Sequence, residues 1–410
     1  MTWKFAGRAD AFDGFAVNNK TVKGLDSFLP GYISPSLFSS KKINMSRQAL
    51  AMLASMNEYD QMQVIKEMYY VSANPHSRSV VRHKRFPLIR IYRSRYPFKN
   101  YHYLLTIKLK DGEVVIHDIA FDERLHGRDI ANNSHQRTQM YHVKKEDGAT
   151  GKYNGTQNNQ EVKALMEEWN ASKAQQTSNV RTIHVTVNGM LNDYNKAAGL
   201  MGIHTQVAYN EDNPREYTLF HNPTDEWKLD IIECGFDKTW KTSHNAKHLA
   251  AVMKQCAQNG QKVKWTVHSQ GAIIFASALT YLEGINPGLK LPNQELVVHA
   301  GGTGVAKLDR IAKKVGLRIN NHKTRINPFD AVPNVCGFEM KNSNSSLMKC
   351  MKAFGLVIND DDMTISPHTL PYFGLELYRL QLINSGHHKA LKRVNDVDLL
   401  IKKLNNTNRC

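Results

Sequence analysis

From residue 181 onward, β-rich runs alternate with helical segments, and this alternation constrains the fold more than any other feature of the sequence. The predicted strands read RTIHVTVNG, YTLFHNP, KVKWTV, ELVVHAGG and HKTRINP. The predicted helices between them read AKHLAAVMKQCAQNG, AIIFASALTYL and KLDRIAKKVG. Strands that are separated by helices pair in parallel, because the helix carries the chain back to the edge where the previous strand began. We therefore predict an α/β fold with a mostly parallel sheet flanked by helices.

The first part of the chain has a different pattern, which predicts an N-terminal α+β domain. The segment SRQALAMLASMNEYDQMQVIKEMYYV has an apolar face at helical spacing, and Ser46 is a suitable N-cap. From Phe86 to Phe121 the pattern changes to period two, with Asp111-Gly112 between two β-rich runs. An Asp-Gly connection of this kind predicts a β-hairpin.

A polar stretch separates the two patterns. Residues 147–180 are rich in Asn, Gln, Gly and Ser, and the short helical segment EVKALMEEW interrupts them. Such a composition is typical of connecting segments, so we place the domain boundary near residue 178. The predicted division is a basic docking or accessory domain over 1–178, an α/β domain over 179–385 and a basic helix or tail over 386–410.

The formal net charge of +17 is unevenly distributed. Ten Lys or Arg residues and no acidic residue lie between Arg78 and Lys110, with aromatic residues between them. Such a stripe attracts polyanions, which include nucleic acid, anionic lipid headgroups and acidic proteins, although no nucleic-acid-binding motif accompanies it. The alternative is a solvated strand face. The candidate anion-binding residues are Arg82, Lys84, Arg85, Arg90, Arg93 and Arg95.

Several classes of protein are disfavoured by the sequence. The N-terminus, MTWKFAGRADAFDGFAV, is interrupted by charged residues and does not have the pattern of a signal peptide. The longest apolar stretch, Ala272–Leu282, is far shorter than the ~20 residues that span a bilayer. The five cysteines are scattered without CxxC spacing, which indicates reduced thiols. We expect synthesis in the cytoplasm, with delivery by a virion or a secretion system as a possible route of export.

The sequence Val267-His268-Ser269-Gln270-Gly271 joins a predicted strand to a predicted helix. A nucleophilic serine in an α/β protein lies on such a sharp turn, within the pattern G-x-S-x-G. Gly271 occupies the second glycine position, whereas Val267 replaces the first. The alternative is an ordinary serine that caps a buried helix.

Two further segments carry residues that would complete a catalytic triad. Asp330 lies between two prolines in NPFDAVP, and His368 precedes the apolar helical segment FGLELYRLQLI. The order Ser269, Asp330, His368, with separations of 61 and 38 residues, is the order of the triad in α/β-hydrolases. Asp330 could instead belong to a simple turn, and the acidic run Asp360–Asp362 is the best alternative source of the triad acid.

Other candidate residues are given structural roles. We expect His268 to line the turn rather than to act as the base, because adjacent side chains point apart. His387-His388 lacks further ligands at metal spacing and is expected on the surface, so no metal site is predicted. The turn from His299 to Gly304 lacks the glycine spacing and the lysine of a phosphate-binding loop.

The region from about 181 to 378 resembles the α/β-hydrolase superfamily, and its lipase-like and esterase-like members in particular. The segments VTVNGMLND, TLFHNPTDEWKLDIIE, INPFDAVPNV and HTLPYF resemble parts of lipase-like domains in bacterial toxins and secreted proteins. The resemblance implies that Ser269 attacks an acyl carbonyl, that His368 transfers the proton and that Asp330 orients the imidazole. It does not extend to residues 1–178.

The resemblance also implies an oxyanion hole and no cofactor. The expected donors are the backbone N–H groups of Gln270 and of Met190 or Gly189. The leading hypothesis is thus a serine ester hydrolase that forms an acyl-enzyme from lipids or lipid-like esters. Smaller acyl esters, thioesters, and protein-bound or cell-wall esters and amides stay open as substrates. The alternative is a structural or interaction protein, such as a component of a virion or secretion apparatus, built on a hydrolase-like scaffold.

Overall fold

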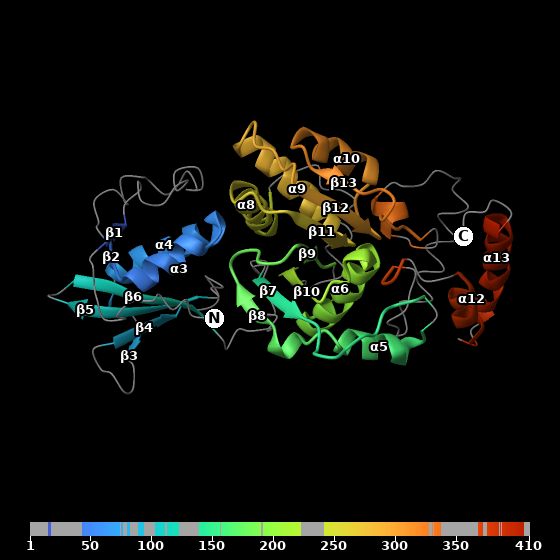
Figure 1. Cartoon of the computed structure of the whole chain (residues 1–410), viewed down its shortest axis with the longest axis horizontal. Helices are drawn as coiled ribbons and strands as arrows, with labels where there is room; N and C mark the ends of the chain where they lie inside the picture. The colour runs from blue at the N-terminus through green and yellow to red at the C-terminus, as the bar shows by residue number, and fades with distance from the viewer. Residues whose placement is uncertain are drawn as a thin grey trace.

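The computed structural model has two units, a smaller N-terminal one and a larger one that carries two helices at the C-terminal end (Figure 1). The structure describes residues 15–17, 43–73, 75–76, 80–82, 89–93, 103–110, 113–122, 139–155, 157–189, 192–222, 242–327, 330, 332–337, 368–371, 375–384, 386 and 388–405.

A seven-stranded sheet forms the centre of the larger unit, in the order β13-β12-β11-β9-β10-β7-β8. Its strands are β7 (Gln139–Lys144), β8 (Gln175–Thr177), β9 (His184–Val187), β10 (Glu216–His221), β11 (Val263–His268), β12 (Gln294–His299) and β13 (Arg318–Ile319). The strands from β13 to β10 are parallel, β7 runs antiparallel to β10, and β8 antiparallel to β7. The prediction of an α/β fold with a mostly parallel sheet is confirmed at this level.

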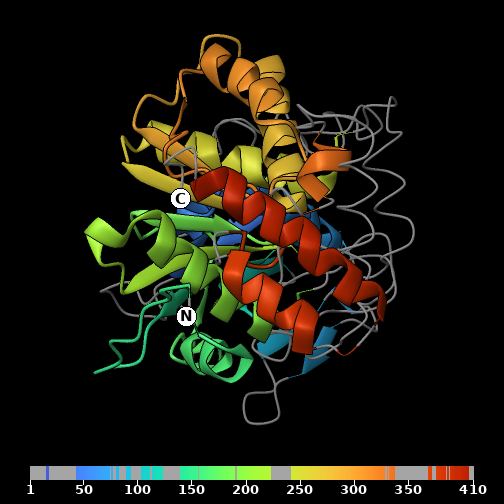
Figure 2. The same cartoon turned by 90° about the vertical axis from the view of Figure 1, so that its right-hand side faces the viewer.

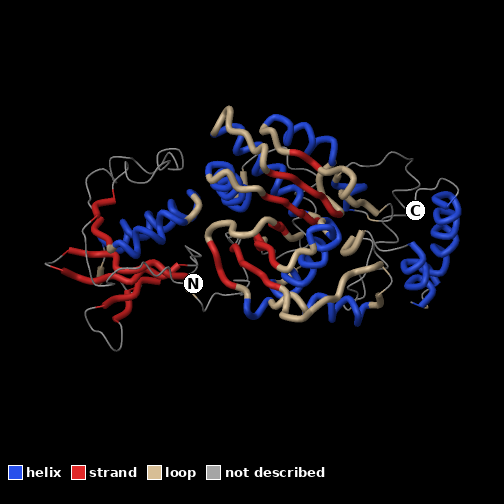
Figure 3. The backbone as a smooth tube through the Cα atoms, viewed as in Figure 1, coloured by secondary structure: helices blue, strands red, loops and turns tan. Residues whose placement is uncertain are grey.

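Helices cover both faces of this sheet (Figure 3). They are α5 (Asn159–Glu167), α6 (Tyr194–Ala208), α8 (His244–Gln258), α9 (Gln270–Ile285) and α10 (Val305–Lys314). Helices α8, α9 and α10 share one core cluster with Trp265 of β11, whereas α6 packs with β7 and β10 in another. Strands β9 and β12 have no exposed residue, as expected for central parallel strands that are covered by helices on both faces.

The direction of chain travel across the sheet reverses at β9. From β9 the chain moves to β10 through α6, and it then crosses back over β9 to β11 through α8. Because such crossovers are right-handed, opposite directions of travel place α6 and α8 on opposite faces. In α/β sheets, sites form beyond the carboxyl ends of the strands that flank such a reversal. The ends of β9 and β11 are therefore where a site is expected.

The N-terminal unit is a six-stranded sheet with two helices on one face. The strand order is β1-β2-β6-β5-β4-β3. These strands are β1 (Phe15–Val17), β2 (Ile43–Met45), β3 (Val80–Arg82), β4 (Ile89–Arg93), β5 (Tyr103–Lys110) and β6 (Glu113–Phe121), and the helices are α3 (Arg47–Ser55) and α4 (Glu58–Ala73). Ser46 caps α3 by accepting the N–H of Ala49 at 3.1 Å, and Lys110 faces Glu113 across an antiparallel pair. The predicted N-cap and hairpin are both confirmed.

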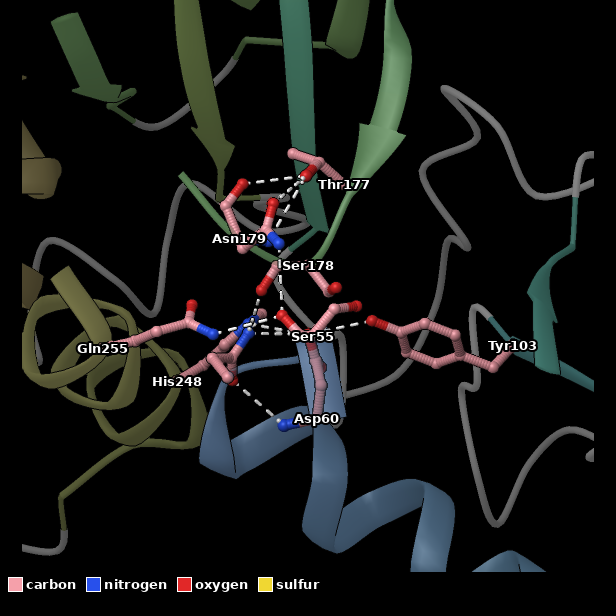
Figure 4. A network of polar contacts seen from close by, with 9 residues as sticks. Ser55, Asp60, Tyr103, Thr177, Ser178, Asn179, His248 and Gln255 are labelled. Carbon is pink, nitrogen blue, oxygen red and sulfur yellow. Dashed lines mark hydrogen bonds and ion pairs between the residues drawn. The ribbon is translucent and has the colours of Figure 1, made fainter. Parts of the chain in front are cut away.

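A buried polar network joins the two units (Figure 4). Asp60 of α4 accepts hydrogen bonds from Asn57 at 2.8 Å and from Tyr103 at 2.9 Å, and it lies 3.4 Å from Nε2 of His248 in α8. The amide of Asn57 also donates to the carbonyl of Ser178 at 2.9 Å. Burial raises the pKa of Asp60, but the nearby His248 and these hydrogen bonds outweigh it and hold the pKa below its ordinary value. The junction between the two units therefore holds a buried, ionised carboxylate whose hydrogen bonds are made by neighbouring side chains.

The predicted domain boundary at residue 178 is wrong, because it cuts through the seven-stranded sheet. Strands β7 and β8 precede residue 178 and both belong to that sheet. The polar stretch over 147–180 holds α5, the 3-10 turn Ala171–Lys173 and β8 rather than a linker between domains. Since β6 ends at Phe121 and β7 begins at Gln139, the two sheets divide between these residues.

The segment HKTRINP is not a strand, contrary to the prediction. The last strand of the sheet, β13, is only Arg318–Ile319, and Arg325 makes an isolated bridge to His299. A short edge strand exposes few unpaired backbone groups, which limits pairing with other chains.

Two C-terminal helices, α12 (Leu375–Asn384) and α13 (His388–Asn405), lie across one end of the larger unit (Figure 2). Tyr378, Leu382 and Val397 of these helices are buried in one cluster with Leu200 of α6 and with Leu370. The predicted helix before the C-terminus and the predicted basic C-terminal helix are thereby confirmed. No helix in the described part of the chain is long and apolar enough to cross a membrane.

Candidate active site

Ser269 lies on a strained turn between β11 and α9. Its backbone has φ 54° and ψ −124°, a conformation that costs a non-glycine residue about 1–3 kcal/mol. The turn is held from both sides, since the N–H of Ser269 donates to His299 O at 3.2 Å and its carbonyl accepts from Gly302 N at 2.9 Å. The hydroxyl makes no capping hydrogen bond to α9. Ser269 is therefore not an ordinary helix cap.

The incomplete glycine pattern around Ser269 is explained by packing. A Cβ atom on Gly271 would lie 2.5 Å from the carbonyl oxygen of Val187, so the second glycine is required by the close approach of helix and strand. Val267 is fully buried in the core cluster that also contains Ala246 and Ala272. It pairs with Val187 and Val298 in the regular ladder, so a valine fits at this position without a special backbone conformation.

Ser269, His368 and Asp330 form a continuous hydrogen-bonded chain. Nδ1 of His368 lies 2.9 Å from Oδ2 of Asp330, and Nε2 lies 2.9 Å from Oγ of Ser269. A carboxylate only accepts, so Nδ1 carries the imidazole proton and Nε2 is free to accept the hydroxyl proton. The structure thus brings together the three residues predicted from the sequence, in the arrangement of a nucleophile, a base and an orienting acid.

Asp330 is held rigidly in a dry environment. Its side chain is fully buried, and the N–H of Val332 donates to Oδ1 at 2.9 Å. Burial raises the pKa of the Asp330 carboxyl, although the facing His368 and the hydrogen bonds oppose this effect. Val332 begins a π-helical turn, Val332–Cys336, that follows directly after the acid. The side chain of His368 retains 18% exposure, so one edge of the triad reaches solvent.

Three further imidazoles surround the triad. His268 donates from Nε2 to the carbonyl of His368 at 2.9 Å, so its ring lies against the backbone that carries His368. The rings of His204 and His268 lie 4.6 Å apart, and Nδ1 of His204 lies 2.8 Å from Nδ1 of His299. Because Nε2 of His299 donates to a carbonyl at 3.2 Å, its Nδ1 accepts the proton of His204.

These imidazoles are kept neutral by their surroundings. Burial lowers the pKa of His299 to about 3. Burial, followed by the neighbouring imidazoles, lowers the pKa of His204 and of His268 well below the ordinary value. Neutral neighbours place no positive charge beside the imidazole of His368. Although histidines gather here, the described residues contain no group of three or more His, Cys, Asp or Glu arranged to hold a metal ion.

The predicted oxyanion donors lie beside Ser269 where the structure describes them. Gln270 is the first residue of α9, and its N–H finds no acceptor among the described residues, as is usual for the first turn of a helix. A Cβ atom on Gly189 would lie 3.1 Å from Oγ of Ser269, so the backbone of Gly189 borders the nucleophile. Met190, the other predicted donor on this loop, is outside the described residues.

Three of the candidate anion-binding residues belong to the N-terminal sheet rather than to the sheet that carries Ser269. Arg82 of β3 faces Arg90 of β4 across an antiparallel pair, and Arg93 ends β4. The remaining candidates, Lys84, Arg85 and Arg95, lie outside the described residues, as do Asp360–Asp362 and His387. His388 begins α13 and is exposed.

The sequence analysis missed two buried asparagines next to the site. Asn188 follows β9 and Asn222 follows β10, and both side chains are almost completely buried. An asparagine after a strand is typical of a turn, and only the pairing of β9 with β10 places the two side by side.

Comparison with protein-family models, with curated proteins and with solved structures finds no match for this chain.

Proposed function

We propose that the chain is a serine ester hydrolase of the α/β-hydrolase type. The observation that carries the proposal is the hydrogen-bonded chain from Ser269 through His368 to Asp330, with the serine on a strained turn. The site lies at the carboxyl end of β11, next to the reversal of strand order at β9. The chain order of the three residues and the close approach of α9 to β9 at Gly271 support the same fold type.

The proposed reaction has two half-reactions. Oγ of Ser269 forms a bond to the acyl carbonyl carbon while its proton passes to Nε2 of His368, and the carbonyl oxygen takes the negative charge. The bond to the leaving alkoxide oxygen then breaks as His368 returns the proton to that oxygen. Water attacks the acyl-enzyme in the same way, with His368 again as the base, and the carboxylic acid leaves. Asp330 stabilises the imidazolium that forms in both halves.

Lipids or lipid-like esters are the proposed substrates. Four of the six large apolar side chains that are exposed in the described part of the chain lie on α12 and α13: Leu380, Ile383, Leu391 and Leu399. The inner faces of these helices pack with Leu370, two residues after His368. The outward face of α13 also carries the exposed Lys392 and Lys402. Such a face suits an anionic lipid surface close to the triad.

The basic N-terminal strands are proposed as a second contact for a polyanion, and the N-terminal unit as a docking part for a larger assembly. Delivery by a virion or a secretion system would need such a part. These roles are independent of the proposed chemistry, and the alternative of a non-catalytic scaffold protein would retain them.

Labelling with a fluorophosphonate probe tests the proposal, because the probe bonds only to an activated serine. We expect the wild-type protein to be labelled and Ser269→Ala to be unlabelled. Ser277→Ala, two turns along α9, is the matched control and should retain labelling. An unlabelled wild type would contradict the proposal and favour the scaffold protein. Hydrolysis of p-nitrophenyl esters of rising chain length and of phospholipid vesicles would then define the acyl substrate.

A further inference from the structure

The carboxyl ends of β9 and β10 are joined by a buried amide network that the proposed chemical steps do not use. Oδ1 of Asn188 accepts the N–H of Asn222 at 2.7 Å, and Nδ2 of Asn188 donates to the carbonyl of Asn222 at 3.0 Å. The same Nδ2 donates to the carbonyl of Gly189 at 2.9 Å. The side chain of Asn188 therefore acts as one more rung of the ladder between the strands and also holds the turn that borders Ser269.

The network continues from Asn222 to the start of α9. Nδ2 of Asn222 donates to Oε1 of Gln270 at 2.9 Å, and Oδ1 of Asn222 accepts from Asn245 of α8 at 2.8 Å. Asn188 is completely buried and Asn222 is 1% exposed, so the bonds between them are shielded from water. A buried amide network in which each member is satisfied is stiff, because breaking any bond leaves an unpaired polar group.

These contacts reach both sides of the proposed oxyanion hole. On one side the network holds the carbonyl of Gly189, and because the peptide unit is planar this bond also orients the whole unit. On the other side it fixes the side chain of Gln270, whose N–H points out of the first turn of α9.

We infer that Asn188 and Asn222 are positioning residues that set the separation between the Gly189 turn and the start of α9. The inference rests on the proposed function, since the separation between the Gly189 turn and the start of α9 matters only if an oxyanion forms between them. Stabilisation of an oxyanion depends on donors that are already in place, and a displacement of about 1 Å can cost about a hundredfold in rate. The alternative is that the two asparagines only provide hydrogen bonds to the backbone groups at the strand ends and have no effect on the oxyanion hole.

The test compares Asn188→Ala and Asn222→Ala with the control Asn57→Ala. Asn57 is also completely buried and has several side-chain hydrogen bonds, but it lies in the junction between the two units. The measurements are kcat and KM with p-nitrophenyl butyrate, the inhibition constant of phenylboronic acid, and the melting temperature. Phenylboronic acid is the probe because its adduct with a serine places an oxygen where the oxyanion would lie.

For Asn188→Ala and Asn222→Ala we expect kcat to fall about 10- to 100-fold and KM to stay within about threefold. The inhibition constant of phenylboronic acid should rise by the same factor as kcat/KM falls. Asn57→Ala should lower the melting temperature and leave kcat/KM and the inhibition constant of phenylboronic acid unchanged. Gln270→Met removes the hydrogen bond at the partly exposed end of the network, so it should affect folding least. We expect the same fall in kcat for this variant.

Unchanged kcat and inhibition constants in folded Asn222→Ala or Gln270→Met would overturn the inference. So would a loss of activity in Asn57→Ala of the same size, because general destabilisation would then suffice. A wild type that neither turns over the ester nor reacts with a fluorophosphonate would instead overturn the proposed function, and the inference with it.

Discussion

A Cβ atom on Gly189 would lie 2.5 Å from the Cβ atom of Ser269, so only glycine fits beside the candidate nucleophile. Real Cβ atoms do not approach this closely, so a side chain at position 189 would force one of the two groups to shift. Ser269 is fixed by its strained turn, and Gly189 is held by the amide of Asn188. The position of Ser269 therefore requires a glycine after β9.

Gly189→Ala should reduce kcat/KM for p-nitrophenyl butyrate about 100-fold or more, because the added methyl group displaces either the serine or the turn. The control is Gly284→Ala within α9, where an added Cβ meets nothing within 4 Å. That variant should keep full activity and gain roughly 0.5–1 kcal/mol of stability, since alanine is the better helix former. Wild-type activity in Gly189→Ala would contradict the proposed site.

Asp330→Asn should lower kcat by about 10⁴-fold, because an amide does not hold the imidazole in the required tautomer. Burial disfavours the charge on Asp330, so we expect little loss in the free energy of unfolding from urea titrations. Asp309→Asn, which removes a surface ion pair with Lys313, is the control and should leave kcat unchanged. The prediction fails if Asp330→Asn retains activity within tenfold of the wild type.

Stability should fall as the pH is lowered from about 6.5 to 4. Burial lowers the pKa of His221 to about 4 and that of His299 to about 3, whereas an unfolded histidine titrates near 6.5. In this window the unfolded chain binds protons that the folded chain does not, so the free energy of unfolding decreases on acidification.

Urea titrations at several pH values would measure this loss, which should amount to roughly 3 kcal/mol for each of the two histidines at pH 4. His221→Gln should flatten the dependence on pH, whereas His322→Gln, at an exposed position, should not. A free energy of unfolding that is constant between pH 6.5 and 4 would show that these histidines titrate normally.

The double variant Leu391→Asp with Leu399→Asp should reduce hydrolysis of anionic phospholipid vesicles at least about tenfold, since each leucine contributes roughly 1.5 kcal/mol or more when it is buried in lipid. Hydrolysis of the soluble p-nitrophenyl butyrate should not change. Asn395→Asp adds a negative charge to an exposed position on the same helix and keeps both leucines, so it separates the effect of charge from that of apolar contact. Equal losses on both substrates would rule out a role in lipid contact.

The sequence predicted what depends on local pattern. Strands and helices after residue 181 followed from apolar periodicity, and the order of Ser269, Asp330 and His368 singled out three residues that the structure places within hydrogen-bonding distance. The roles assigned to these residues stay predictions until a reaction is measured.

What the sequence did not predict depends on contacts between distant segments. The membership of β7 and β8 in the larger sheet is set by the pairing of Tyr217 with Val143, and no local pattern encodes that pairing. The amide network needs Asn188 and Asn222 to meet across paired strands, 34 residues apart in the chain. The place of Val267 likewise depends on its pairing with Val187 and Val298 in the sheet.

The polar junction of Asn57, Asp60 and His248 also determines how the protein can be divided. Lys254 of α8 forms an ion pair with Glu58 of α4 at 2.8 Å, and both are largely covered. A fragment that begins at residue 139 would uncover this face of α8 and remove Glu58 and Asp60, which lie against Lys254 and His248. The two units, although each has its own sheet and core, therefore share a polar interface that a division between the sheets would break.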